Sequence, residues 1–116
     1  AEMKIALLLA TIAALIMVPF ASAETETLKG TVGPGFTISL KYEGKTAKTL
    51  KAGTYKVVVS DKSSIHDFHL TGPGVNKSTS VGGTGTKTWT LKLKKGTYKF
   101  VCDPHASVMK GSFKVT

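Results

Sequence analysis

The stretch GTYKFVCDPHASVMKG, residues 96–111, combines a strand pattern with side chains that bind soft metal ions. Tyr98, Phe100 and Cys102 share one face of the expected strand, because successive side chains point to opposite faces. Cys102 ends that strand and begins a loop. The short CDPH turn brings His105 back toward the sulfur. This segment therefore predicts that a thiolate and an imidazole lie close together at one end of a β-strand.

Met109 follows in the same loop, and His66 lies far upstream in a second strand-like run. A thiolate, two imidazoles and a thioether suit copper held in a Cys/His/His plane with a long axial Met. Zinc is the competitor, but structural zinc sites usually use paired CxxC or HxxxH ligands. Neither pairing is present, and Cys102 is the only cysteine. Taken singly, Cys102 also fits an inert buried thiol and Met109 fits a core filler.

The run IHDFHL, residues 65–70, places two histidines on opposite faces of an expected strand. His66 shares the apolar face with Phe68, whereas His69 shares the polar face with Asp67. A histidine on an apolar face also fits a core residue whose hydrogen bonds are satisfied. The Cys/His/Met cluster lacks one nitrogen donor, which favours His66 as the ligand. We expect His69 to face solvent.

Period-two alternation dominates the chain after residue 24, and helical periodicity is almost absent. Glycine- and proline-containing turns separate the alternating runs. Short strands at this spacing indicate an antiparallel sandwich or barrel. LKAGTYKVVV from Leu50 matches LKKGTYKFVC from Leu93 at seven of ten positions, which predicts equivalent turn-plus-strand units in two parts of one sandwich. The expected strands lie at residues 28–32, 36–42, 46–50, 89–93, 98–102 and 113–115, with a loop at 76–85.

The N-terminus has the layout of a secretory signal peptide. Lys4 precedes an apolar run over residues 5–18, and Ala21-Ser22-Ala23 provides an A-x-A cleavage site. The alternative is a retained membrane anchor over residues 5–23, close to the length of about 20 residues that spans a bilayer. We therefore divide the chain into residues 1–23, a signal or anchor helix, and residues 24–116, one folded domain. The domain is expected in the periplasm or at the outer face of the membrane.

The charge is strongly basic, with 16 Lys+Arg against 7 Asp+Glu, and every basic residue is lysine. Nucleic-acid binding usually relies on arginine for bidentate contacts, so we do not expect it here. Lysines that alternate with apolar residues are typical of a solvated strand face. They contribute to solubility, or they steer the protein toward an acidic partner or an anionic membrane surface.

The domain resembles the cupredoxins, the small blue copper proteins that include plastocyanin and azurin. The likeness rests on His66-Asp67, on GTYKFVCDPH, and on Met109-Lys110-Gly111 before the closing strand. It covers residues 28–116. The resemblance implies an all-β Greek-key β-sandwich of about eight strands. It also implies one copper ion that cycles between Cu(I) and Cu(II), with the ligands His66, Cys102, His105 and Met109.

One position departs from the family pattern. Asp67 stands where cupredoxins usually have an asparagine whose amide ties the ligand loops together. An ionised carboxylate accepts hydrogen bonds but cannot donate them. We expect Asp67 to accept bonds from the backbone or hydroxyls near Ser63 and Ser64.

These features predict an exported, monomeric one-electron carrier between redox partners. The alternative is a protein for copper trafficking or storage that uses the same ligands. We do not expect an enzyme, because two of the three histidines are already assigned to the metal, and because the sequence contains no Ser-His-Asp set, no paired carboxylates in a plausible cleft and no phosphate loop. The resemblance places His105 near the surface. Pro104, Ala106 and the turns at 33–35 and 72–74 are expected to form an apolar docking patch, with lysines at its rim for an acidic partner.

Overall fold

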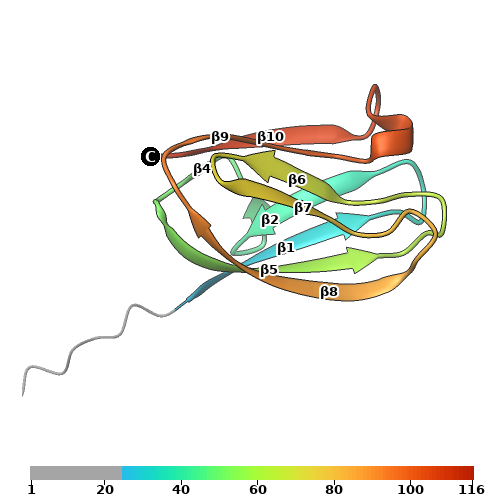
Figure 1. The fold of residues 1–116 in the computed structure, drawn as a ribbon, viewed down its shortest axis with the longest axis horizontal. Helices are drawn as coiled ribbons and strands as arrows, with labels where there is room; N and C mark the ends of the chain where they lie inside the picture. Colours follow the sequence, from blue (N-terminus) through green and yellow to red (C-terminus); the bar gives the residue numbers. More distant parts are fainter. Residues whose placement is uncertain (1–24) are drawn as a thin grey trace, which may run out of the picture.

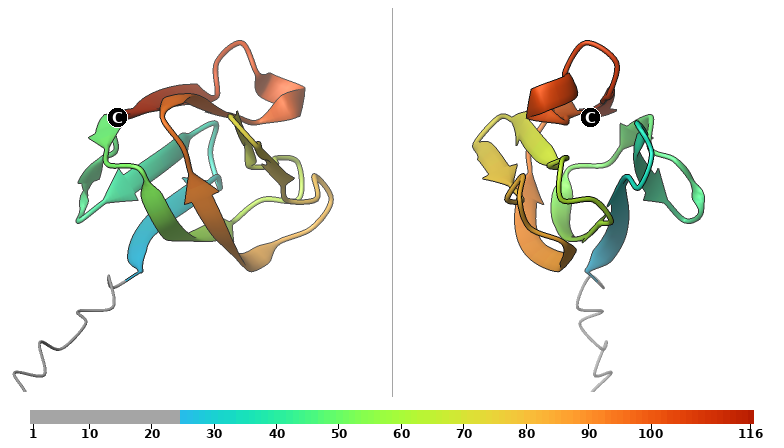
Figure 2. Two further views of the ribbon diagram at one scale, coloured as in Figure 1. Left: turned by 60° about the vertical axis from the view of Figure 1, so that its left-hand side comes forward. Right: turned by 90° about the vertical axis from the view of Figure 1, so that its right-hand side faces the viewer.

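The computed structural model describes residues 25–116, which form two five-stranded β-sheets packed face to face (Figures 1 and 2). The expected all-β sandwich is therefore confirmed, and the expected N-terminal helix lies outside the described residues. Within residues 25–116, no helix is long and apolar enough to cross a membrane. The elements are β1 Glu26–Val32, β2 Ile38–Tyr42, β3 Lys45–Thr46, β4 Thr49–Leu50, β5 Gly53–Asp61, β6 His69–Gly72, β7 Val75–Ser78, β8 Gly85–Leu93, β9 Gly96–Val101, the 3₁₀ turn η1 Asp103–His105, and β10 Lys110–Val115.

The sheets are mixed, whereas an antiparallel sandwich was expected. One sheet has the order β3-β2-β1-β5-β8 and the other β4-β10-β9-β6-β7. The pairs β1–β5 and β4–β10 are parallel, and the remaining pairs are antiparallel. The expected strand over residues 46–50 is in fact two short strands in different sheets. The chain crosses between the sheets at Ala47 and Lys48, whose backbone groups bond to Leu40 and Lys114 respectively. This split accounts for part of the difference between the ten strands found in residues 25–116 and the expected eight or so.

The core lies between the two sheets and follows the period-two pattern. Inward positions of β5 and β9 are buried, while the alternate positions are exposed or half-buried. Two stacked aromatic pairs lie in the core against the β4-β10-β9-β6-β7 sheet: Phe68 with Phe100, and Tyr98 with Phe113. Burial of apolar surface on this scale is the main force that holds the two layers together.

The internal repeat has the structural meaning that the sequence predicted. Its first copy runs into β5 of one sheet, and its second copy runs into β9 of the other. The two tyrosines make the same contact. The Tyr55 hydroxyl donates to the Lys51 carbonyl at 2.6 Å, and the Tyr98 hydroxyl donates to the Lys94 carbonyl at 2.9 Å. In each copy, the tyrosine hydroxyl therefore stabilises the turn that precedes the strand.

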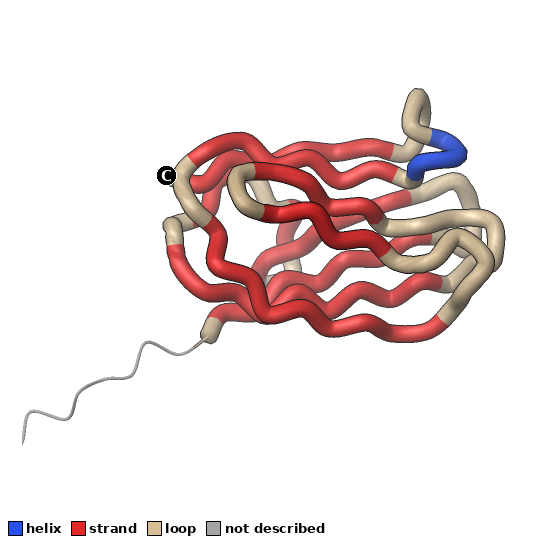
Figure 3. Tube along the Cα trace, viewed as in Figure 1, coloured by secondary structure: helices blue, strands red, loops and turns tan. Residues whose placement is uncertain are grey.

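Several strand boundaries differ from those expected from the sequence. The strand that contains His69 begins at that residue, so His66 lies in the preceding loop. The alternation of burial continues into this loop at His66 and Phe68, but Asp67 between them is also buried. The expected loop over 76–85 is partly strand, because β7 continues to Ser78. Figure 3 shows that long loops gather at the end of the sandwich where η1 lies.

Gly72 is required by packing, since a Cβ at this position would overlap the ring of Tyr98. We expect Gly72→Ala to lower the free energy of unfolding by about 1–3 kcal/mol, the usual cost of overpacking a core. Urea denaturation measures the loss. Gly53→Ala is the matched control, because its Cβ would meet no atom within 4 Å. Equal stability of the two variants would contradict this packing argument.

Candidate metal centre

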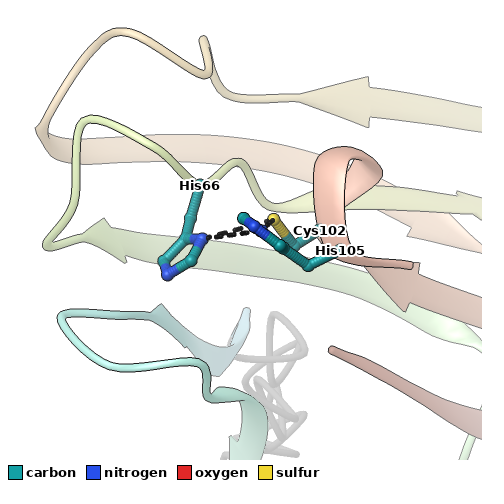
Figure 4. Close-up of side chains that lie close together, drawn as sticks. All are labelled: His66, Cys102 and His105. Carbon is teal, nitrogen blue, oxygen red and sulfur yellow. Dashed lines mark hydrogen bonds between the residues drawn. The ribbon is translucent and has the colours of Figure 1, made fainter. Parts of the chain in front are cut away.

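The candidate site lies at the end of the sandwich where β9 stops and β10 begins. Cys102 directly follows β9, and η1 turns the chain so that His105 faces back toward it. His66 reaches the same point from the loop between β5 and β6 (Figure 4). Hydrogen bonds close the turn, because the backbone N–H of His105 donates to the Cys102 carbonyl at 3.0 Å. The structure thus brings together three of the four residues predicted as metal ligands.

The three donor atoms form a nearly equilateral triangle. The two Nδ1 atoms of His66 and His105 are 3.1 Å apart. The Cys102 sulfur lies 3.6 Å from the His66 Nδ1 and 3.5 Å from the His105 Nδ1. The centre of such a triangle is about 2.0 Å from each corner, close to the bond lengths that nitrogen and sulfur ligands make with a metal ion. One thiolate and two imidazoles in a trigonal arrangement match the equatorial set of a blue copper centre.

Burial supports the same reading of these side chains. His66 and Cys102 have no exposed surface. Among residues 25–116, the Nε2 atom of His66 has no hydrogen-bond partner, so its ring makes polar contacts only with Cys102 and His105. Burial raises the pKa of the Cys102 thiol. A bound cation would oppose that effect by favouring the thiolate.

Phe36 covers both imidazoles, and the sequence analysis did not identify this role. Its ring meets those of His66 and His105 edge-on, with centroid distances of 5.2 and 5.0 Å. Phe36 lies in the loop before β2, not on the expected strand over 36–42, and it is 62% exposed. Gly33 lets the backbone of the same loop lie against Ser63 and the His66 ring. Its φ is +73°, and a Cβ there would come within 2.9 Å of the Ser63 Cβ and 3.4 Å of the His66 ring.

Met109 is buried beside the ligand loop. Its carbonyl accepts a hydrogen bond from the Cys102 N–H at 3.0 Å, and its own N–H donates to the His105 carbonyl at 2.8 Å. Its side chain is 1% exposed. These bonds bring residue 109 next to both equatorial ligands of the loop. Its role as a weak axial ligand stays a prediction.

Asp67 ties the two ligand loops together, although not through the partners expected from the sequence. Its Oδ1 accepts a hydrogen bond from the Asp103 N–H at 2.6 Å. The Ser63 N–H donates to Asp61 instead, because the loop turns back on the end of β5. Burial raises the pKa of Asp67 to about 6, and the neighbouring Asp103 carboxylate adds to that effect. A carboxylate at position 67 can therefore replace the usual asparagine as an acceptor from the Cys102 loop.

The sequence suggested that His69 simply faces solvent, but its side chain makes two polar contacts. Its Nδ1 lies 2.9 Å from a carboxylate oxygen of Asp103, and its Nε2 lies 2.6 Å from the side-chain oxygen of Asn76. A protonated imidazole satisfies both contacts, because each partner offers an oxygen acceptor. The hydrogen bond with Asp103 is the main cause that raises the pKa of His69. His69 thus connects the β6–β7 hairpin to the ligand loop.

His69→Gln is expected to lower the free energy of unfolding by about 0.5 kcal/mol near pH 5 and by almost nothing near pH 9. The raised pKa means that the charged imidazole stabilises the folded state. That stabilisation is complete below the ordinary histidine pKa and is lost as the pH rises through the raised pKa. The effect is small because the side chains of His69 and Asp103 are 25% and 51% exposed. Urea denaturation at the two pH values tests this, and an equal loss at both would contradict it.

Comparisons with known proteins identify the family. Residues 37–116 match the family of copper binding proteins described as plastocyanin/azurin. The chain belongs to this family. No curated protein matches the chain.

Solved cupredoxin structures share the fold. Reduced rusticyanin is 24% identical, with a TM-score of 0.57 and 79% of each chain covered. Rusticyanin from Thiobacillus ferrooxidans is 25% identical, with a TM-score of 0.55 and coverage of 79% of this chain and 77% of that one. The solution structure of reduced rusticyanin gives 25% identity, a TM-score of 0.52 and coverage of 78% and 76%. Membership of the plastocyanin/azurin family, together with the Cys/His/His triangle, makes copper the cofactor of this cupredoxin.

Proposed function

We propose that this cupredoxin is a type 1 copper protein that carries single electrons between redox partners. His66, Cys102 and His105 would hold the copper ion, and Met109 would be its fourth, weaker ligand. The triangle of two Nδ1 atoms and one sulfur, with sides of 3.1–3.6 Å, is the observation that carries this proposal. The bound copper ion would supply the Cu(I)/Cu(II) couple.

In electron transfer, the protein would keep the metal-binding side chains in fixed positions and shield them from water. The backbone of Cys102 bonds to Met109, and the backbone of Asp103 bonds to Asp67. These bonds fix the ligand loop to the start of β10 and to the His66 loop. The side chains around the copper ion would therefore move little when the ion gains or loses an electron. The burial of Cys102 and His66 excludes water from the ligand plane. Both features favour a small reorganisation barrier.

His105 is the proposed point of electron exit. It is half-buried, and three exposed apolar side chains, Phe36, Ile65 and Val108, belong to loops at this end of the sandwich. Pro104 and the 33–35 turn lie in the same group of loops. The 72–74 turn was expected to form part of this patch, but it does not belong to it. Pro73 packs against Gly96 at the start of β9, which is the opposite end of that strand from Cys102.

We also propose that the mature protein starts near residue 24 and acts outside the cytoplasm, as a monomer. The sequence pattern over residues 1–23 supports export. The single thiol is buried at the site, which suits an oxidising compartment because ligation protects it from oxidation. Mass spectrometry of the protein from its native cell envelope would measure the start directly.

Visible and electron paramagnetic resonance spectra of the Cu(II)-loaded protein test the function. We expect an intense thiolate-to-copper band, a narrow copper hyperfine splitting and reversible one-electron reduction. Tight Cu(I) binding without a stable Cu(II) form would instead indicate trafficking or storage. The carrier role also implies that the protein has no catalytic turnover.

A further inference from the structure

The outer face of the β4-β10-β9-β6-β7 sheet carries a row of lysines. Lys99 on β9 pairs with Ser112 on β10, and Lys110 and Lys114 are the residues two positions either side of Ser112. Lys99 is therefore the diagonal neighbour of both, at about 7–8 Å across the strands. All three lysines are exposed. The row runs along the strands that lead into and out of the metal centre.

A groove lies within this row. Lys99 and Lys110 line it together with Val101, Gly111 and Ser112, and its volume is about 370 Å³. Gly111 presents only backbone to the groove, because the side-chain position of this residue points inward to the ring of Phe100. The groove therefore offers two ammonium groups, one hydroxyl and open backbone, which suits a carboxylate side chain.

Acidic side chains do not balance these lysines. None of the residues in the five strands of this sheet is Asp or Glu. The neighbouring acid at the metal end, Asp103, is already bound to His69. Lysines that are diagonal neighbours at about 7–8 Å repel one another weakly, so this row does not stabilise the fold. A surface that keeps such a row is suited to a partner of opposite charge.

The row is also joined to the metal centre by the chain itself. Val101 in the groove directly precedes Cys102, and Lys110 directly follows Met109. The backbone bond from the Cys102 N–H to the Met109 carbonyl closes the space between them. A partner bound in this groove would contact the residues directly next to two proposed copper ligands in the chain, Cys102 and Met109. By contrast, Lys29 and Lys41, which face each other on β1 and β2, have no such link.

We propose that this lysine face, defined by Lys99, Lys110 and Lys114, docks the acidic surface of a protein redox partner on the flank of the sandwich. The inference rests on the proposed carrier function and adds a second contact surface to the apolar end around His105. The occupant is a protein and not a membrane. Among residues 25–116, the exposed large apolar residues are Phe36, Ile65, Val81 and Val108, and none of them lies on this face.

Nuclear magnetic resonance of the Cu(I) protein titrated with a deca-aspartate peptide tests the surface directly. We expect the largest amide shifts at Lys99, Val101, Lys110 and Gly111, and we expect salt to weaken them. The double variant Lys99→Glu/Lys110→Glu should lose them. The double variant Lys29→Glu/Lys41→Glu changes the net charge equally and should keep them. Largest shifts around Lys29 and Lys41, or a response only to phosphatidylserine vesicles, would overturn the proposal.

Oxidation of the Cu(I) protein by hexacyanoferrate(III) tests whether the face leads to the copper. One electron passes from Cu(I) to Fe(III), giving Cu(II) and Fe(II). At low ionic strength, Lys99→Glu/Lys110→Glu should slow the second-order rate at least tenfold, and Lys29→Glu/Lys41→Glu should slow it about threefold or less. Equal slowing would overturn the proposal. Absence of any Cu(I)/Cu(II) cycle in the unmodified protein would instead refute the carrier function, while the peptide titration would still report on the face.

Discussion

Cys102→Ser is expected to abolish the intense visible band of the Cu(II)-loaded protein completely. Cys102 supplies the sulfur corner of the Cys/His/His triangle, and no other residue can supply a thiolate because the chain has a single cysteine. A serine oxygen is a harder and far less basic donor toward copper. We expect copper affinity to fall by at least about a hundredfold, beyond the ten- to hundredfold that follows loss of an outer hydrogen-bond partner. Absorption spectra and competition with a copper chelator measure both effects.

Ser107→Ala is the matched control for this substitution, since it alters an exposed side chain in the same loop. It should leave the band and the affinity unchanged. Circular dichroism of the copper-free serine variant separates loss of a ligand from loss of the fold. A serine variant that is folded and still shows the intense band would refute the assignment of Cys102.

Copper loading is expected to raise the free energy of unfolding by about 4 kcal/mol once free copper exceeds the dissociation constant a thousandfold. For a domain of this size, that corresponds to a rise in Tm of about 16 °C or more. The physical reason is that the folded chain holds three donors within 3.1–3.6 Å of one another, whereas the unfolded chain has no such cluster. Differential scanning calorimetry with and without copper measures the shift.

His66→Ala provides the sharpest comparison for this second experiment. It removes a ligand that lies 36 residues from Cys102 along the chain, so it destroys the folded site but leaves the Cys102–Met109 loop intact. We expect most of the copper-induced rise in Tm to disappear. A rise that persists in full would mean that copper binds to the local loop alone and that residue 66 is not a ligand.

Much of the site was visible in the sequence because three of its residues fall within one short loop. The spacing of Cys102, His105 and Met109 already implies that a strand ends and a turn folds back. The period-two pattern also identified β1 and β9 to within two residues at each end, whereas it found only the second half of β10. Turns rich in glycine and proline marked where strands end, since these residues adopt backbone conformations that strands do not use.

Other parts of the site depend on contacts between loops that no local pattern reveals. Phe36 covers both imidazoles because the 33–37 loop folds over the end of the sandwich. Asp67 bonds to Asp103 because two loops from different strands meet there. The sequence around His66 alternates like a strand, but in the folded loop His66, Asp67 and Phe68 are all buried. An exposed aromatic residue after Gly-Pro-Gly was the one available hint for Phe36.

The linear chain is sufficient to specify which donors are present, which strand and turn carry the loop of three, and how basic the surface is. These properties depend on residue type and on spacing of a few positions. Folding is needed to bring the Nδ1 atoms of His66 and His105 within 3.1 Å, and to gather Lys99, Lys110 and Lys114 on one face. Both arrangements depend on strand pairing and on sheet packing between segments distant in sequence. Burial energy summed over the whole core selects that pairing, and no short stretch of residues carries it.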